Sequence, residues 1–330
     1  MKTPASSFLP DAFMRQLEWG MHQNGSYLLN KAISKIHRVP ASKQALERET
    51  SAGYVAQTDA APAKGASPLN GQQIGHYTLI RQLGQGGYAS VFLGEHHYLN
   101  TYVALKLLNL YLASEEDTKH FQLEARILAH LRHRNIVRLL DFGVERGTPF
   151  LVMEYASKGN LQQFLPHEGA LPVGIILPFV TQMASALQYV HNHGLIHCDV
   201  KPENMLLGPL NELWLSDFGI AITTTAVSNK EFNTHELKGS VNYMAPEHIN
   251  GNPMPASDQY ALAAMVYQWL CGRFLFQGTD MQVCLQHLST PPIPLRDHVP
   301  STPRAVEHVV LKALVTHISA LRMYRSLPLP

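Results

Sequence analysis

Apolar and polar residues alternate with a strand-like period at the start of the regularly patterned part of the chain. Three short extended runs, 77–83, 89–96 and 102–108, are separated by turn residues. A run of four to eight residues bounded by turn residues is typical of a strand. We therefore predict an antiparallel meander over this region.

The next segment has a helical period. Ser114 is suited to cap a helix at 114–131, because acidic residues fill the first turn and Phe121, Leu128 and Leu131 recur at helical spacing. Two further strand-like runs follow at 136–143 and 149–155. The first part of the domain is therefore predicted to be a small sheet with one helix.

Long helices are predicted in the second part. The stretch 176–194 repeats apolar residues along one face, and 258–272 is apolar nearly all round, which is typical of a buried central helix. A third helix is predicted at 300–314, capped by Ser301 or Thr302 with Pro303 in its first turn. A sheet-rich part followed by a helical part predicts an α+β fold of two lobes.

The chain before this domain has a different composition. Residues 40–73 are rich in Ala, Pro, Gly, Ser and Gln, so we expect a flexible linker there. Residues 1–39 form an extension in which Leu29, Ile33 and Ile36 fit one short amphipathic helix. The folded domain is expected over 74–325, with a tail at 326–330.

Composition excludes several classes of partner. Lys and Arg total 26 against 25 Asp and Glu, and the net charge of +1 offers no field for nucleic acid or an anionic membrane. We see no apolar run of the length, about 20 residues, that spans a bilayer, and no secretory signal. Three cysteines are too few for a disulfide framework, so we expect a cytoplasmic protein. The oligomeric state is left open.

A glycine-rich stretch, "LGQGGYASV", contains Gly84, Gly86 and Gly87. A dinucleotide site needs a helix after the glycines, but here another strand follows, and no Gly-Lys-Ser/Thr of a P-loop is present. What remains is a β-hairpin whose backbone N–H groups approach phosphates. Lys106 on the next strand would reach those phosphates, and Glu124 on the following helix would pair with it.

The second part of the domain carries the more specific pattern. "LIHCDVKPENMLL" supplies His197, Asp199, Lys201 and Asn204, and "LWLSDFGIA" then supplies Asp217 in a glycine-containing turn. An acid-x-Lys-x-x-Asn cluster followed by a second acid indicates a metal and nucleotide site, because core packing requires no such cluster.

With these motifs in this order, residues 74–325 resemble a protein kinase, specifically a bacterial eukaryotic-like serine/threonine kinase. The resemblance implies a bilobal fold, with a small antiparallel-sheet N-lobe at 74–153 and a larger helical C-lobe at 157–325. It also implies ATP and Mg²⁺, with Mn²⁺ as an alternative ion, and protein substrates that carry Ser or Thr acceptors. We expect the final helix of the family pattern to be missing.

The resemblance assigns a role to each motif residue. Asp199 would accept the proton of the acceptor hydroxyl, while Lys201 would neutralise charge on the transferring group. Asn204 and Asp217 would bind the metal ion. Lys106 would orient the phosphates beneath the three glycines, and Glu124 would hold it. The adenine pocket would be formed by Val91, Ala104, Met153, Glu154, Ala156 and Leu206.

Other residues of the motifs would support the site. Asp258 would anchor the turn that carries Asp199, and Ser240 would bond Asp199 and Lys201. Glu247, in "GSVNYMAPE", would pair with a buried arginine, for which Arg322 is the candidate.

The chain departs from the family pattern at several positions. Ala89 replaces a third glycine, and Cys198 replaces the arginine that usually pairs with a phosphorylated residue. We therefore expect activity to depend little on phosphorylation of the segment after Asp217. The candidate acceptors in that segment are Thr223, Thr224, Thr225, Ser228 and Thr234.

The leading hypothesis is an active serine/threonine protein kinase, with autophosphorylation and a signalling role. Two alternatives stay open. One is a pseudokinase, a nucleotide-binding or scaffold module, which the substitutions Ala89 and Cys198 and the short C-terminus favour. The other is a small-molecule phosphotransferase, against which the peptide-platform segment 239–247 argues.

Overall fold

The structure, a computed structural model, describes residues 70–86, 89–109, 114–165, 169–218, 222–223 and 241–314. The described residues divide into two compact units. We call residues 70–119 and 139–155 the sheet unit, and residues 120–138 and 156–314 the helical unit. This is the predicted combination of a small antiparallel sheet and a larger, mainly helical part.

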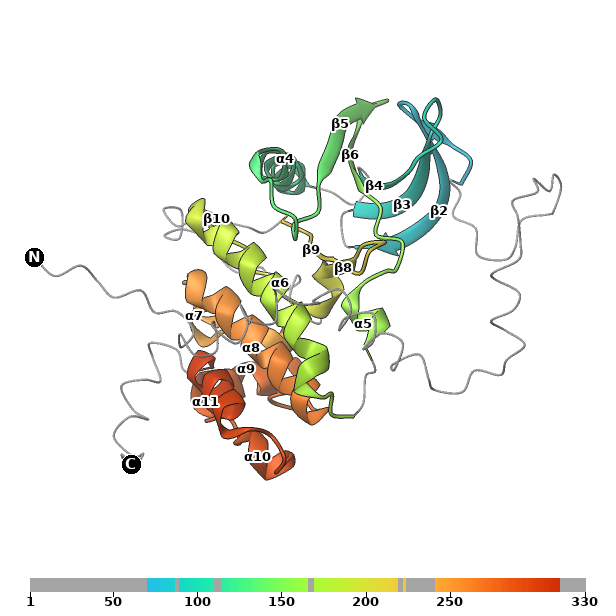
Figure 1. The fold of residues 1–330 in the computed structure, drawn as a ribbon. Helices are drawn as coiled ribbons and strands as arrows, with labels where there is room; N and C mark the ends of the chain where they lie inside the picture. Colours follow the sequence, from blue (N-terminus) through green and yellow to red (C-terminus); the bar gives the residue numbers. More distant parts are fainter. Residues whose placement is uncertain are drawn as a thin grey trace, which may run out of the picture. The chain divides into compact units, whose positions relative to one another are not determined.

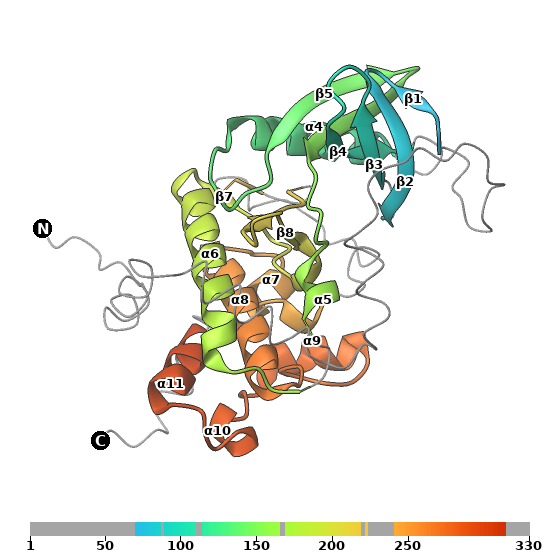
Figure 2. The same cartoon turned by 45° about the vertical axis from the view of Figure 1, so that its right-hand side comes forward.

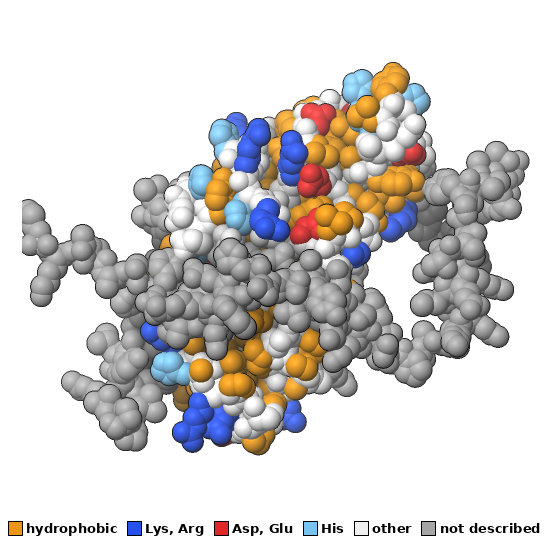
Figure 3. Space-filling view, viewed as in Figure 1, with side chains coloured by type: hydrophobic (Ala, Val, Ile, Leu, Met, Phe, Trp, Pro, Cys, Tyr) orange, Lys and Arg blue, Asp and Glu red, His pale blue; other side chains and the backbone are white. Residues whose placement is uncertain are grey.

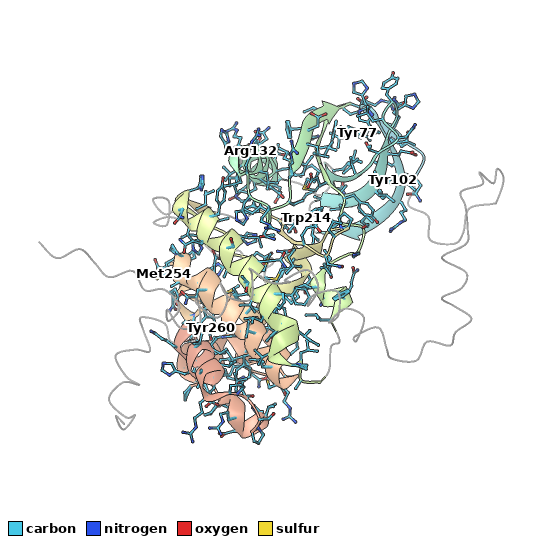
Figure 4. The ribbon with its side chains drawn as sticks, viewed as in Figure 1. Tyr77, Tyr102, Arg132, Trp214, Met254 and Tyr260 are labelled. Carbon is cyan, nitrogen blue, oxygen red and sulfur yellow. The ribbon has the colours of Figure 1, made fainter. Side chains whose placement is uncertain are left out.

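The sheet unit contains six strands that are all antiparallel, in the order β1-β2-β3-β4-β6-β5 (Figure 1; β1 is labelled in Figure 2). Their bounds are β1 Gln73–Ile74, β2 Tyr77–Gln85, β3 Ala89–His96, β4 Tyr102–Leu108, β5 Leu139–Glu145 and β6 Thr148–Glu154. Buried residues including Leu79, Phe92, Leu105 and Val152 form its core. Figure 4 labels Tyr77 on β2 and Tyr102 on β4, of which Tyr77 is buried and Tyr102 exposed. The predicted meander is confirmed.

One predicted strand begins later than expected. The run 136–143 was expected to be extended throughout, but β5 starts at Leu139. Ile136 instead forms a parallel bridge with Leu215, and the N–H of Val137 donates to the carbonyl of Leu215 at 2.9 Å. The apolar run is therefore shared between two units, because its first residues pack in the helical unit and its remainder in the sheet.

Helix α4, Glu115–His130, spans the division between the two units and begins as predicted. The Asp117 N–H donates to Ser114 Oγ at 3.1 Å, and the Ser114 N–H donates to Asp117 Oδ2 at 2.7 Å. This reciprocal pair satisfies two backbone donors that would otherwise lack partners.

The helical unit is built around α6, Val173–Asn192, and α8, Pro255–Cys271, which lie side by side in both Figure 1 and Figure 2. Its other helices are α5 Leu161–Phe164, α7 Pro246–Ile249, α9 Asp280–Ser289, α10 Leu295–His298 and α11 Arg304–Ala313, with the short helices η1 Pro202–Asn204 and η3 Val241–Tyr243. Its strands are β7 Leu195–Ile196, β8 Met205–Leu207, β9 Leu213–Leu215 and β10 Ile222–Thr223. As predicted, α8 is buried over most of its surface.

Two predicted helix starts are wrong in detail. Helix α6 begins at Val173, three residues earlier than expected, with Pro172 at the N-cap. Helix α11 begins at Arg304 with Pro303 at the N-cap, and no side chain caps it. Thr302 does not cap α11, because it belongs to the preceding turn, where its N–H donates to the carbonyl of Val299 at 2.9 Å.

Helix α6 alone among the described helices is long and apolar enough, by length and composition, to cross a membrane. The same composition suits the central helix of a folded unit. Ile176, Phe179, Met183 and Val190 of α6 are buried, and the helix packs against α8, β7 and β9. We therefore read α6 as a core helix.

Candidate active site

The turn between β7 and η1 carries His197 and Asp199, and a buried histidine ring fixes its shape. The N–H of Asp199 donates to Nδ1 of His197 at 3.2 Å, and Nε2 of His197 lies 3.0 Å from the carbonyl oxygen of Ser216. Because a backbone N–H can only donate and a carbonyl can only accept, the ring is neutral with its proton on Nε2. His197 therefore ties the turn of Asp199 to the residue before Asp217.

The side chain of Asp199 is held by two donors at one oxygen. Lys201 Nζ lies 2.7 Å from Asp199 Oδ2, and Asn204 Nδ2 donates to the same oxygen at 2.8 Å. Asn204 Nδ2 also donates to the carbonyl of Asp199 at 2.9 Å. Three residues that the sequence singled out are thus brought into one cluster, in which the carboxylate cannot rotate freely.

Asp258 of α8 anchors this turn, as predicted. Its Oδ2 accepts the N–H of His197 and its Oδ1 accepts the N–H of Cys198, both at 2.9 Å. Cys198 has a φ of 67°, in the left-handed region that a non-glycine residue seldom adopts. The two hydrogen bonds from the backbone help to hold this strained conformation directly before Asp199.

Asn204 and Asp217 are linked through Ser216. The N–H of Ser216 donates to the carbonyl of Asn204 at 2.9 Å, and its hydroxyl donates to the same carbonyl at 3.1 Å. Asp217, next in the chain, has a φ of 64°. A second left-handed residue therefore stands at the other end of the same cluster.

These residues fit a hard divalent cation that also binds phosphate oxygens. The hydrogen bonds of Asn204 to Asp199 use its amide nitrogen, so the amide oxygen is the atom left to coordinate a cation. Within the described ranges, no group of three or more His, Cys, Asp or Glu side chains is arranged to hold a metal. Two protein oxygen ligands completed by nucleotide oxygens suit Mg²⁺ better than a cage built only from protein.

A pocket in the helical unit lies beside Asp199 and Cys198, and Tyr243, His248 and Asp258 also line it. Burial lowers the pKa of His248, while the nearby carboxylates of Asp258 and Asp199 act in the opposite direction. Burial would raise the pKa of Asp258, but the hydrogen bond and charge of His191 and the hydrogen bond from the backbone N–H of His197 outweigh it and lower the pKa. Asp258 therefore stays ionised although it is buried.

The sheet unit carries the predicted phosphate and adenine residues. Gly84 lies opposite Val91 across β2 and β3, and Val91 lies opposite Lys106 across β3 and β4. The N–H of Gly86 donates to the carbonyl of Ala89 at 2.8 Å. Lys106 is buried, with 7% of its surface exposed. The hairpin and the lysine are thus on consecutive strands, as predicted, while Gly87 lies outside the described residues.

The remaining adenine residues are divided between the two units. Ala104 lies opposite Met153 across β4 and β6, and both are buried, while Glu154 ends β6. Ala156 and Leu206 belong to the helical unit, where Leu206 pairs with Trp214 across β8 and β9. The roles of these residues in binding adenine stay predictions.

Glu124 is buried in α4, within the helical unit, whereas Lys106 belongs to the sheet unit. Their ion pair stays a prediction. Glu247 is also buried, and its Oε1 accepts a hydrogen bond from Ser257 Oγ at 2.6 Å, whereas its Oε2 has no partner among the described residues. Its expected partner Arg322 lies outside the described residues, as does Ser240.

The chain matches a known protein family. The protein kinase domain family matches residues 77–314. The chain belongs to this family. The turn that carries Asp199, the Asn204–Asp217 link and the Asp258 anchor therefore lie within a protein kinase domain.

Three bacterial relatives illustrate the similarity. The chain is 34% identical over 250 residues to serine/threonine-protein kinase PrkC of Bacillus subtilis, and this match covers 74% of this chain and 38% of the relative. It is 34% identical over 295 residues to serine/threonine-protein kinase Pkn1 of Myxococcus xanthus, covering 86% of this chain and 42% of the relative.

A third relative is the DNA damage-responsive serine/threonine-protein kinase RqkA of Deinococcus radiodurans, 36% identical over 242 residues. These cover 72% of this chain and 36% of that protein. The chain therefore spans about two fifths of the length of these curated relatives.

One side chain that contacts Asp258 was not predicted from the sequence. His191, in the last turn of α6, lies with Nε2 2.8 Å from Asp258 Oδ2. Its spacing of six residues from His197 carries no signal, because the contact depends on how α6 packs against α8.

Proposed function

We propose that the chain transfers the γ-phosphate of ATP to serine and threonine hydroxyls of proteins. The observation that carries the proposal is the cluster in which Lys201 and Asn204 hold one oxygen of Asp199 while Asp258 fixes the backbone of the same turn. Such a rigid carboxylate suits a group that must receive a proton in one defined direction.

In the proposed reaction Asp199 orients the acceptor hydroxyl and takes its proton as the oxygen bonds to the γ-phosphorus. The bond from the γ-phosphorus to the bridging oxygen breaks, and ADP leaves. Lys201 places positive charge next to Asp199, where the transferring group passes.

Asn204 and Asp217 would bind the divalent ion, which supplies neutralising charge to the phosphates. Mg²⁺ is the ion we infer from the oxygen donors, and Mn²⁺ is an alternative. Gly84 and Gly86 on the β2–β3 hairpin, with Lys106 on β4, would hold the phosphates. Val91, Ala104, Met153, Glu154, Ala156 and Leu206 would enclose the adenine.

Protein substrates are inferred from the segment 239–247, which resembles the peptide platform of protein kinases, and from Lys201 in "KPEN". The names of the bacterial relatives support the same class. We further infer autophosphorylation and a signalling role. The net charge of +1 gives no basic field of the kind that draws nucleic acid to a protein. On the face drawn in Figure 3, side chains of both charges lie among apolar and uncharged ones. Three free thiols suit the cytoplasm.

The test is incubation of the purified chain with γ-labelled ATP and Mg²⁺, alone and with a generic basic protein acceptor. Label should appear on serine or threonine of the acceptor. Lys106→Met and Asp217→Ala should each abolish transfer while the protein stays folded. ATP binding without transfer by the unmodified chain would instead indicate a pseudokinase, and label on an added metabolite would indicate a small-molecule phosphotransferase.

A further inference from the structure

A histidine outside the catalytic motif contacts the residue that anchors it. His191 Nε2 lies 2.8 Å from Asp258 Oδ2, the oxygen that also accepts the N–H of His197 at 2.9 Å. The other oxygen, Oδ1, accepts the N–H of Cys198 at 2.9 Å. One carboxylate therefore joins α6 to the backbone of the catalytic turn.

Asp258 holds both backbone groups most strongly while it is ionised. A carboxylate accepts through both oxygens, whereas a protonated carboxyl turns one of them into a donor. Protonation would place an O–H on one of these oxygens and weaken the hydrogen bond that this oxygen accepts from the backbone N–H of His197 or Cys198. The geometry of Asp199, the next residue, depends on that anchor.

Burial works against the ionised form. Asp258 is 1% exposed, and a carboxylate that is removed from water takes up a proton more readily. The hydrogen bond and the charge of His191 are among the interactions that keep the pKa of Asp258 low. Without His191, burial would be opposed mainly by the backbone N–H groups of His197 and Cys198.

Several titratable side chains surround Asp258 from the elements packed on α8. Figure 4 labels Met254 and Tyr260, which lie at the start of the same helix. The titratable groups that face Asp258 or line the adjoining pocket are His191, His197, Cys198, Asp199, Tyr243 and His248. Among them only His191 donates a side-chain hydrogen bond to the carboxylate in the described part of the chain.

We propose that His191 is a positioning residue, which keeps Asp258 ionised and so keeps the turn of Asp199 in its active geometry as the pH falls. The kinetic part of this proposal rests on the proposed function. The structural part does not, since the state of the turn can be measured without turnover.

The structural experiment follows the amide of Cys198 by NMR in the full chain labelled with ¹⁵N-cysteine. The chain has three cysteines, so three amide signals are expected, and Cys198→Ser identifies the relevant one. In the unmodified protein this signal should stay constant between pH 8 and pH 5. In His191→Leu it should titrate within this range, because burial that is no longer opposed by the His191 hydrogen bond can raise the pKa of a carboxylate by about 3–5 units.

Two variants complete the comparison. His191→Gln keeps an N–H near the position of Nε2 and should restore the constant signal. His193→Leu is the matched control, because His193 is near His191 but its Nδ1 contacts the carbonyl of Tyr189 instead of Asp258. If His191→Leu does not fold, His191→Asn, which is polar but too short to reach Asp258, takes its place.

The kinetic experiment measures kcat and KM for ATP from pH 8 to pH 5.5. For His191→Leu we expect kcat to fall about tenfold more than in the unmodified protein over this range, as a titration midpoint about one unit above pH 5.5 requires, with little change in KM. An amide titration that matches the unmodified protein, or a loss of kcat that is equal at every pH, overturns the proposal. If the unmodified chain has no activity, the proposed function fails, and the amide titration still decides the role of His191.

Discussion

Lys201 Nζ lies 2.7 Å from Oδ2 of Asp199, and both side chains are more than four fifths buried. In this setting an ion pair is less screened by water than on an open surface, and Asn204 adds a second donor to the same oxygen. The pair places a positive charge beside the proposed proton acceptor. Lys201 can therefore serve both the orientation of Asp199 and the charge of the transferred group.

Gly84 offers a way to separate nucleotide binding from folding. Its φ is not in the left-handed region, and a Cβ built on it would meet nothing within 4 Å, so nothing in the described protein requires glycine there. We expect Gly84→Ala to change the free energy of unfolding by less than about 0.5 kcal/mol. If the hairpin backbone approaches phosphates, the same variant should raise KM for ATP several-fold, measured by steady-state kinetics.

A matched control for this variant is Gly143→Ala on β5, where a Cβ would collide with the ring of Phe150. That variant should lose stability in urea unfolding. An unchanged KM in Gly84→Ala would contradict the phosphate-binding role of the hairpin.

Gly272 ends α8 and should tolerate no side chain. Its φ is 71°, and a Cβ would lie 2.7 Å from the backbone carbonyl carbon of Gly169. The left-handed conformation alone costs an ordinary residue about 1–2 kcal/mol, and the clash with a backbone atom adds about 1–3 kcal/mol. Gly272→Ala should therefore lower the free energy of unfolding by several kcal/mol, measured by urea denaturation.

Gly147 provides the comparison for Gly272, because it has a φ of 82° but open space around its Cβ position. Gly147→Ala should lower the free energy of unfolding only by the cost of the left-handed conformation, about 1–2 kcal/mol. Equal losses in the two variants would show that the contact with Gly169 does not matter.

The sequence predicted those elements whose hydrophobic period is local. The strands at 77, 89 and 102 and the cap at Ser114 follow from side-chain alternation and from a hydrogen bond between residues three apart. The prediction at 136–143 failed because Ile136 and Val137 pair with Leu215, far along the chain. The contact between His191 and Asp258 could not be predicted for the same reason, because the two residues are 67 positions apart in the chain.

The helix cap at 301–302 failed for a different reason. Ser and Thr are good caps, but Thr302 is already used in the turn that begins at Val299, and Pro303 supplies an extended conformation without a donor. Motif spacing correctly indicated that Asp199, Lys201 and Asn204 form one cluster, because the three residues are close in the chain. The pairing of Lys106 with Glu124 stays a prediction.

Acid should destabilise the helical unit through His287. This side chain is 5% exposed, and its Nδ1 lies 2.7 Å from the hydroxyl of Tyr260, a residue of α8 labelled in Figure 4. Burial lowers the pKa of His287 from 6.5 to about 4, against an opposite effect of the backbone at Val241 and Asn242.

The pKa of His287 is lower in the folded state than in the unfolded state. Its contribution to the free energy of unfolding is therefore fully present above pH 6.5 and is lost as the pH falls toward 4. The loss should approach about 3 kcal/mol at the lower end. Urea unfolding at pH 7, 6 and 5 measures it, and His287→Phe should flatten this part of the pH dependence. The same slope in both proteins would assign the effect to other groups.

Phosphorylation of the segment after Asp217 should change activity little. Cys198 stands where an arginine would pair with a phosphate, and its own N–H is engaged with Asp258. Alanine at Thr223, Thr224, Thr225, Ser228 and Thr234 should therefore leave kcat nearly unchanged. A large rise in kcat upon phosphorylation of one of these residues would contradict this expectation. Cys198→Arg should make activity respond to phosphorylation.

The central claim is that Asp199 directs the transfer of phosphate from ATP to a protein hydroxyl. Its most direct test is single-turnover transfer of γ-label by Asp199→Asn, together with ATP binding by the same variant. We predict unchanged binding and a rate lower by about 10²–10⁴-fold. Transfer at the rate of the unmodified chain would contradict the account.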